Sequence, residues 1–385
     1  MRQSGNGKSK KPESPVSAPC RKACSLNLTN GDGANGMMLN AGNQCVQGVK
    51  MKKIVCALIA STATASVLAL DPMPEEAGFS GSLAVGAAGG KVESNFLARV
   101  LGIDLSDSTI YSLSSPSDTK IISPTFDYNI GYTFNSKKTR VSLASAAEAS
   151  IDFSSNTTLT LRHNFDSIGH IELAALAPPL AQVDVWKNPY LTDQKRDRTD
   201  LSTSGVRATW DKILGSNFEF IATFKKKDIG DELSGQNLGL SATEEKLLER
   251  GGDITVAELG YAFVLGGGKN MIRPSIAYVD YDLDGGAMSQ DGYRLGVAHM
   301  YNGGDFRWLN RALYESLDGD KVNPIFNKTN NADLYIVASE LRFPEPLGWD
   351  KWVATTGIQW GDNDADIDFN KSSTLLFVAR VVRTF

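Results

Sequence analysis

Strict alternation of apolar and polar residues is the feature of this sequence that most constrains its fold. In "IISPTFDYNIGYTF", residues 121–134, one parity is mostly apolar and the other mostly polar. The apolar parity holds Ile122, Pro124, Phe126, Tyr128, Ile130, Tyr132 and Phe134. Because successive side chains of a β-strand point to opposite faces, this pattern predicts a strand with one apolar and one polar face.

The same alternation recurs along the chain and predicts fourteen strands. They span residues 78–90, 121–134, 139–150, 157–165, 169–177, 201–211, 217–227, 254–266, 271–283, 292–301, 305–315, 332–343, 351–361 and 373–385. Most are longer than the roughly 5–6 residues typical of soluble proteins and match the roughly 9–11 residues of a tilted transmembrane strand. We therefore predict an all-β protein, an antiparallel transmembrane β-barrel of about fourteen strands. Counts of twelve or sixteen stay open, because the strand around 171–177 is weak and "AQVDVW" at 181–186 fits either its extension or a loop.

The predicted connections alternate between long and short. Residues 91–120, 178–200, 228–253, 316–331 and 362–372 form the long ones, and residues 135–138, 166–168, 212–216, 267–270 and 302–304 form the short ones. Short periplasmic turns opposite longer external loops are typical of bacterial outer-membrane barrels. With fourteen strands, both chain termini fall on the periplasmic side.

Two tryptophans support a membrane-spanning strand. Trp352 and Trp360 share one parity and lie eight residues apart. In a tilted strand this spacing covers roughly 20 Å along the membrane normal, close to the separation of two interfacial aromatic girdles.

The end of the chain, "TLLFVARVVRTF", resembles the C-terminal strand by which outer-membrane barrels are recognised for assembly. Phe385 is the last residue, and Val381 and Phe377 share its parity. Arg383 departs from the pattern, which usually has an aromatic or apolar residue at that position. The resemblance implies that the barrel assembly machinery is a partner.

Residues 51–69 have the organisation of a cleavable secretory signal peptide. Lys52 and Lys53 precede a short apolar run, and compact residues lead to a predicted cut after Ala69. Residues 1–50 are polar, lack helical or strand periodicity, and are interpreted as a disordered upstream extension that is not translated, with Met51 as the start. The predicted barrel domain is then residues 70–385.

Composition excludes several classes of function. All four cysteines lie before residue 57, so the mature chain has no thiol for disulfides or catalysis. Beyond residue 69 the chain holds 30 basic and 42 acidic residues, and a nucleic-acid-binding protein requires a clustered basic face. We predict location in the outer membrane, contact with its lipid and lipopolysaccharide, and no nucleic-acid partner. The oligomeric state stays open.

Two motifs near the mature N-terminus add a resemblance. Residues 76–81, "EAGFSG", and residues 93–96, "ESNF", resemble a domain-of-unknown-function family of porin-like outer-membrane barrels from marine gammaproteobacteria. The resemblance extends over about residues 72–385. It implies a fold and a compartment but carries no established activity.

The inward face of the predicted barrel is charged, which favours a channel. Assigning the more apolar parity to lipid sends to the lumen Arg140, Glu148, Arg162, Arg207, Glu219, Lys225, Arg273, Arg294, Arg307, Arg311 and Arg380. Charges of both signs on an inward face make a hydrated pore and tune its solute preference. We therefore predict a porin-like channel for the passive passage of small hydrophilic solutes. The alternatives are lumenal charges that pair across the barrel and close it, and a non-conducting surface barrel that acts in adhesion or envelope structure through its external loops.

No catalytic constellation emerges from the sequence. His163, His170 and His299 all fall near predicted periplasmic turns, and Asp280 and Asp282 at an outer strand end have no histidine beside them in this topology. Neither GxSxG nor HExxH occurs. We predict that the protein is not an enzyme and holds no cofactor.

Two predicted external loops carry local signals. Ser241 and Glu244 have capping-box spacing and Gly251 is a stop signal, which predicts a short helix. The helix would constrict the pore or cap the barrel outside.

Asp362, Asp364 and Asp366 alternate like the start of a calcium loop, but the EF-hand glycine and glutamate are absent. A solvated acidic loop is the default expectation there, and a bridging divalent cation the weaker one.

Overall fold

The computed structural model describes residues 72–100, 102–147, 155–180 and 182–385. The predicted signal peptide and upstream extension lie outside these residues, so both stay predictions.

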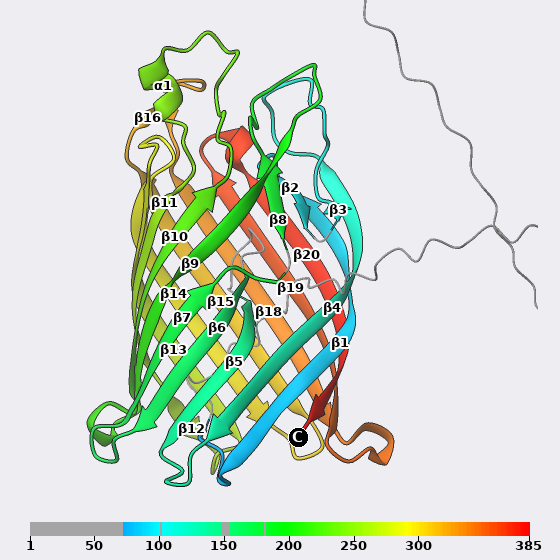
Figure 1. The fold of residues 1–385 in the computed structure, drawn as a ribbon, viewed down its shortest axis with the longest axis vertical. Helices are drawn as coiled ribbons and strands as arrows, with labels where there is room; N and C mark the ends of the chain where they lie inside the picture. The colour runs from blue at the N-terminus through cyan, green and yellow to red at the C-terminus, as the bar shows by residue number, and fades with distance from the viewer. Residues whose placement is uncertain (1–71, 101, 148–154, 181) are drawn as a thin grey trace, which may run out of the picture. The chain divides into compact units, whose positions relative to one another are not determined.

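Fourteen strands form a closed antiparallel barrel (Figure 1). In order around the wall they are β1 (Gly78–Glu93), β4 (Asp118–Thr133), β5 (Thr139–Ala147), β6 (Ser155–Asn164), β7 (His170–Ala177), β9 (Arg198–Asp211), β10 (Phe218–Ile229), β11 (Gly252–Tyr261), β13 (Asn270–Leu283), β14 (Gln290–Asn302), β15 (Arg307–Gly319), β18 (Ala332–Pro344), β19 (Trp352–Ala365) and β20 (Ser372–Thr384). Each pairs with the next, and β20 pairs with β1 to close the ring. The predicted fold class is confirmed, including the weak segment around 171–177, which lies in β7.

Short elements complete the structure. They are β2 (Leu97–Val100), β3 (Ile103–Asp104), β8 (Val183–Trp186), β12 (Phe263–Leu265), β16 (Val322–Asn323), β17 (Lys328–Thr329), the helix α1 (Ala242–Lys246) and the 3-10 turns η1 (Ile213–Gly215), η2 (Pro346–Gly348) and η3 (Asp368–Asn370). Residues 183–186 of the ambiguous segment "AQVDVW" form a separate strand, because β8 pairs with β9 beyond the end of β7 and also pairs with β2.

The two ends of the barrel differ as the connection lengths predict. Short connections lie at one end, here called the short-turn end, together with the start of β1 and the C-terminus (Figure 1). Long connections and α1 lie at the other, the long-loop end. β15 and β19 run four residues farther toward the long-loop end than predicted, because their polar ends still pair with neighbouring strands.

Tight turns at the short-turn end need unusual backbone angles. Gly169, just before β7, has φ +107°, and an added Cβ would lie 2.4 Å from the carbonyl oxygen of Asp211. Only glycine accepts both the left-handed backbone and this close approach.

Large apolar side chains are exposed along the outer face of the wall. Val206, Ile276 and Phe377 leave 58%, 55% and 57% of their surface uncovered. A continuous apolar exterior is expected for a surface that faces lipid.

Aromatic residues mark both ends of this exterior. Tyr293, Tyr314 and Tyr335 on β14, β15 and β18 form a row with ring centroids 6.2 and 5.3 Å apart. Trp360 lies one strand farther on, opposite Val337, and Trp352 lies at the start of β19 beside the short-turn end. The two tryptophans that predicted the girdles therefore share the outer face, eight residues apart.

The last strand seals the barrel. The backbone N–H groups of Phe385 and Gly81 each donate to the other residue's carbonyl oxygen, at 3.1 and 3.0 Å. The predicted assembly residues Phe385, Val381 and Phe377 are all exposed on the outer face. Arg383, which departs from that pattern, stacks on the Trp352 ring at 5.7 Å and donates to the backbone oxygen of Asp350 at 2.6 Å.

The helix α1 has the predicted capping box. The Ser241 hydroxyl accepts from the Glu244 backbone N–H, and the Glu244 carboxylate accepts from the Ser241 backbone N–H. The helix ends at Lys246, five residues before the predicted stop at Gly251, and the backbone oxygens of Leu247 and Glu249 accept from the N–H groups of residues 287 and 285. Within the described part of the chain, no helix is both long and apolar enough to cross a membrane.

Candidate channel lumen and loop cluster

Eighteen charged side chains share the inward parity of the described wall strands. The basic ones are Arg140, Arg162, Arg207, Lys225, Lys227, Arg273, Arg294, Arg307, Arg311, Arg342 and Arg380. The acidic ones are Asp127, Glu172, Asp211, Glu219, Glu258, Glu315 and Glu340. Ten of the eleven predicted pore-lining residues lie on this face, and Glu148 lies outside the described residues. Their role in lining a pore stays a prediction.

Eight of the eighteen charges were missed from the sequence. They are Asp127, Glu172, Asp211, Lys227, Glu258, Glu315, Glu340 and Arg342. Each lies on the polar parity of its predicted strand, so continuing the same count along every strand would have found them.

Two lumenal arginines lie flat against glycines on the neighbouring strand. An added Cβ on Gly260 would lie 2.6 Å from Cζ of Arg273, and one on Gly131 would lie 2.6 Å from Cζ of Arg140. Each arginine thereby reaches an acceptor two strands away. Arg273 on β13 donates to Glu219 on β10, and Arg140 on β5 donates to Ser80 on β1 at 2.7 Å.

Arg380 also lies beside a glycine, at the pairing of β20 with β1 that closes the barrel. Its register partner on β1 is Gly86, and beyond that strand its guanidinium donates to Asp127 on β4 at 2.8 Å. On the other side it donates to Glu340 on β18 at 2.7 Å, and Glu340 also pairs with Arg342 at 2.6 Å. The contacts of this one side chain therefore span five consecutive wall strands, β18, β19, β20, β1 and β4.

A second ion-paired group lies along β10 to β15. Arg273 also pairs with Glu258 on β11 at 2.8 Å. Arg294 on β14 pairs with Glu315 on β15 at 2.6 Å. In both groups the paired residues belong to the same or nearby strands, so these side chains follow the wall.

The remaining predicted residues occupy other parts of the inner wall. Arg162 contacts Nδ1 of His170 at 3.2 Å, and Arg207 donates to the Thr223 hydroxyl at 2.9 Å. Lys225 lies between Gly205 and Ile254 in the strand register. Arg311 faces Ala338, and Arg307 faces Arg342 at the short-turn end of β15.

The three histidines lie near the short-turn end, as expected. His163 contacts the Thr139 hydroxyl at 2.7 Å, and His299 lies between Asn270 and Asn310, each 3.2 Å away. His170 pairs with Asp211 at 3.3 Å. The contacts of the described histidines therefore bring no hydroxyl nucleophile to the His170–Asp211 pair.

An apolar cluster occupies the inside of the barrel toward the long-loop end. The strands β2 and β8 contribute Leu97, Val100, Val183 and Val185. They pack with inward residues of the wall, which are Val92 on β1, Ile121 on β4, Leu201 on β9 and Leu376 on β20. Segments from two loops therefore fold into the barrel and narrow it on this side.

A second apolar cluster joins loops across the mouth. Tyr190, in the connection between β7 and β9, lies 5.0 Å from Phe369, in the connection between β19 and β20. Eight wall strands separate the two connections in one direction and six in the other, so they leave the wall on nearly opposite sides. Leu248 after α1 and Ile367 complete the buried cluster. Burial raises the pKa of the Tyr190 hydroxyl, so the ring stays neutral.

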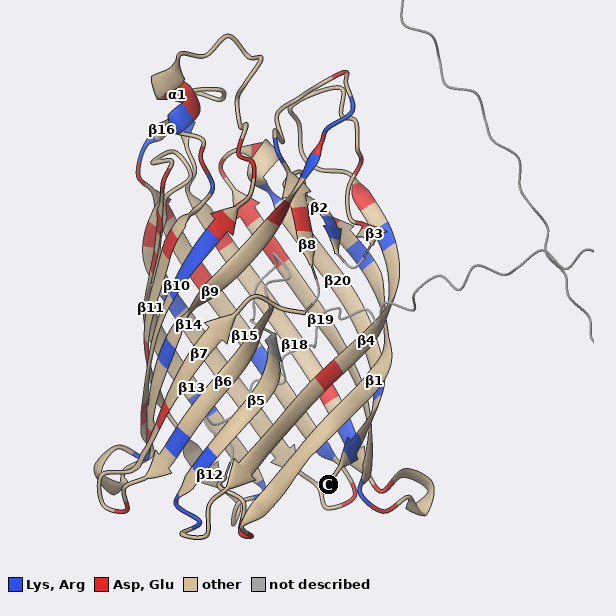
Figure 2. Ribbon diagram, viewed as in Figure 1, with Lys and Arg blue, Asp and Glu red and all other residues tan. Residues whose placement is uncertain are grey.

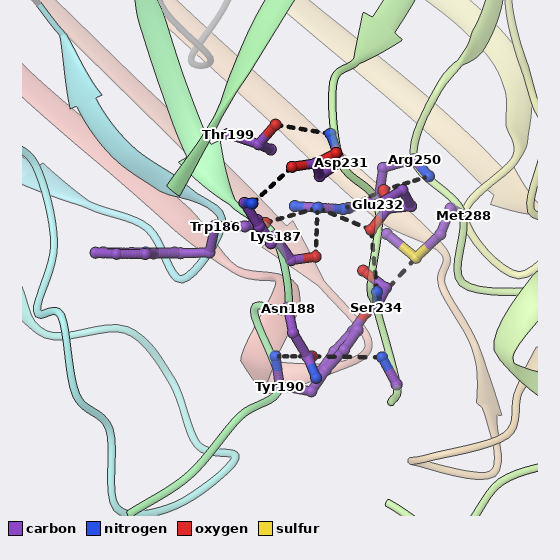
Figure 3. A network of polar contacts seen from close by, with 11 residues as sticks. Trp186, Lys187, Asn188, Tyr190, Thr199, Asp231, Glu232, Ser234, Arg250 and Met288 are labelled. Atoms are coloured by element: carbon purple, nitrogen blue, oxygen red, sulfur yellow. Dashed lines mark hydrogen bonds and ion pairs between the residues drawn. The ribbon is translucent and has the colours of Figure 1, made fainter. Parts of the chain in front are cut away.

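Buried charged side chains also hold the long connections together near this cluster. Trp186 is fully buried, donates to the Ser106 hydroxyl at 2.9 Å and lies 4.4 Å below the Arg196 guanidinium. Burial lowers the pKa of Arg196 to about 10, so it remains charged at neutral pH. Arg250 pairs with Glu232 at 2.9 Å and donates to the backbone oxygen of Trp186 at 2.7 Å (Figure 3).

One lysine pairs with two carboxylates of the predicted acidic loop. Lys371 pairs with Asp364 at 3.1 Å and with Asp368 at 3.0 Å. Asp366 accepts from the side chain of Asn331. Among the described residues, no group of three His, Cys, Asp or Glu has a geometry that could hold a metal ion.

Comparison with known proteins gives a family and distant structural likenesses. Residues 78–380 match the family described as "Protein of unknown function (DUF2860)". No curated protein matches the chain.

Three solved structures illustrate the likenesses. A FadL homologue of Pseudomonas aeruginosa is 9% identical, with 80% of this chain and 90% of that chain covered and a TM-score of 0.42. The anion-selective porin of Comamonas acidovorans is 8% identical, with 80% and 100% covered and a TM-score of 0.37. The outer-membrane channel DcaP of Acinetobacter baumannii is 10% identical, with 82% and 100% covered and a TM-score of 0.38.

Proposed function

Because this chain belongs to the DUF2860 family of proteins of unknown function, its activity has to be inferred from the barrel itself, and we propose that it is an outer-membrane channel for small hydrophilic solutes. The apolar exterior supports placement in a membrane, and the long-loop end would face the cell exterior. Residues 51–69 would direct export, and lipid, lipopolysaccharide and the assembly machinery would be its partners in the envelope.

The observation that carries the proposal is the way the lumenal arginines lie. Arg140 and Arg273 lie flat against glycines and reach partners along the wall. Charges that pair along the wall leave a hydrated path along the barrel axis, whereas pairs that cross the lumen would close it. A charged, hydrated inner face is what distinguishes channel-forming barrels from barrels with a packed interior.

The two apolar clusters formed by the long connections would make such a path narrowest toward the long-loop end. They pack on inward residues of β1, β4, β9 and β20 toward the long-loop end. In the same half, Lys225 and Lys227 on β10 and the Arg294–Glu315 pair bring charge to the inner wall. Solutes would therefore pass beside the clusters, along the wall from β10 to β15.

Single-channel recording tests the proposal. Residues 70–385 would be refolded, checked for heat-modifiable migration and inserted in a planar lipid bilayer, with neutral and charged sugars as blockers. We expect stable conductance steps that a hydrophilic solute reduces. A well-folded barrel that gives no steps would overturn the proposal.

The second candidate is a non-conducting surface barrel that acts through its external loops in adhesion or envelope structure. The contact between Tyr190 and Phe369 favours it, because this contact spans the mouth. In that case a variant whose loop cluster is loosened would also give no conductance steps in the bilayer.

A further inference from the structure

Resting on the proposed channel, we propose that the lumen prefers small anions, both inorganic anions and organic carboxylates, over cations. The inward face of the described strands holds eleven basic and seven acidic side chains, a net excess of four positive charges. The chain as a whole has the opposite balance, 39 basic against 44 acidic residues. The fold has therefore gathered basic residues on the inside.

The alternation of side chains along each strand separates the basic residues of the inner face from acidic residues of the outer face. Around the long-loop end, aspartates occupy the outer face, and Asp280, Asp291 and Asp318 face one another directly on β13, β14 and β15. These carboxylates project away from the lumen, and dissolved ions screen charges on the exposed outer face. Figure 2 shows acidic residues concentrated at this end of the wall.

Basic residues on one side of the wall rise from the short-turn end toward the long-loop end. Arg140 on β5 faces Arg162 on β6, and both lie within three residues of a short turn. Arg207 lies farther up β9, opposite Thr223 of β10, and Lys225 is one inward position beyond Thr223. An anion moving along this wall would remain close to a positive charge over most of the barrel's length.

Narrow, low-dielectric passages make such an excess effective. Rings and rows of lysine and arginine set anion selectivity in pores because the walls concentrate the field of fixed charges. The apolar clusters narrow the long-loop half, where Lys225 and Lys227 project inward. These two lysines should therefore have the largest influence on selectivity.

The strand β10 offers a matched test, because three consecutive lysines lie on it (Figure 2). Lys225 and Lys227 have inward parity, whereas Lys226 projects from the outer face and pairs with Asp228 at 3.6 Å. Counted over the described wall strands, K225E lowers the net inward charge from four to two, and K225E/K227E brings it to zero. K226E makes the same change in total charge on the other face.

The measurement is the reversal potential of the refolded barrel in a potassium chloride gradient, with acetate and citrate as additional anions. We expect chloride to be more permeant than potassium, K225E to lower this ratio, K225E/K227E to bring it near one, and K226E to leave it unchanged. Heat-modifiable migration of each variant checks that it has folded.

The outcomes separate the two proposals. A conducting barrel that prefers potassium, or in which K226E shifts the ratio as much as K225E, would overturn the anion preference and leave the channel standing. A folded barrel with no conductance would overturn both.

Discussion

The ring of Tyr190 lies 5.0 Å from the ring of Phe369, although the connections that hold them leave the barrel on nearly opposite sides. Both rings are fully buried. The contact therefore closes part of the mouth at the long-loop end with a small apolar core. In a channel this core would limit the conductance, and in a surface barrel it would hold the loops in a defined shape.

Replacing Tyr190 by alanine should loosen the loop cluster. Emptying a fully buried aromatic site costs about 3–5 kcal/mol in a packed core, so we expect the loops to separate while the wall stays folded. Single-channel conductance should then rise, and the loops should become more sensitive to protease. Y111A is the matched control, because Tyr111 lies in a connection at the long-loop end and is 80% exposed. Equal behaviour of the two variants would show that the cluster does not restrict the mouth.

Replacing Gly260 by alanine should displace the Arg273 guanidinium from the wall. The added Cβ would lie 2.6 Å from Cζ of Arg273, so the side chain has to leave Glu219 and project into the lumen. Overpacking of this kind costs about 1–3 kcal/mol. We expect a lower unfolding temperature and a smaller conductance.

The control for this change is G89A. Gly89 lies on the outer parity of β1, and its added Cβ meets no atom closer than 3.5 Å. If G260A conducts and unfolds as G89A does, the flat position of Arg273 is not what keeps the lumen open.

Removing Arg380 should destabilise the seam of the barrel. R380A leaves Asp127 and Glu340 without the guanidinium that lies 2.7–2.8 Å from each. Hydrogen bonds to charged groups contribute about 1.5–3 kcal/mol, and denaturant unfolding should show a loss of at least this size. R383A, on the outer face of the same strand, loses a stacking contact of about 0.5–1 kcal/mol and an exposed hydrogen bond to the backbone oxygen of Asp350, so its loss should be smaller. A larger loss for R383A would contradict the tie across five strands.

Cysteine labelling tests which end of the barrel faces outward. Ser115 is exposed in a long connection and Ser136 in a short turn. Since residues 70–385 contain no cysteine, a thiol placed there is the only one in that part of the chain. S115C should react with a membrane-impermeant thiol reagent on intact cells, and S136C should react only after the outer membrane is opened. The reverse result would invert the proposed orientation.

Local patterns predicted the architecture because they reflect the surroundings of each face. A strand between lipid and a hydrated interior must alternate, so residues 121–134 revealed their two faces without any knowledge of their partners. The same rule placed Arg140, Arg273 and Arg380 on the inner face. The capping box of α1 could also be predicted from the sequence, because its two hydrogen bonds join residues only three positions apart.

Partnerships between distant segments could not be predicted in this way. Parity places Arg380 on the inner face but does not select Asp127, 253 residues earlier, as its acceptor. Nor does any local signal bring Tyr190 to Phe369. The sequence by itself determined the all-β class and the two faces of the wall strands, because alternation is a property of each strand alone, and it indicated about fourteen strands with twelve or sixteen left open. Only the tertiary structure decided how the lumenal charges pair and which loops span the mouth, because closure of the barrel sets the distances between strands far apart in the chain.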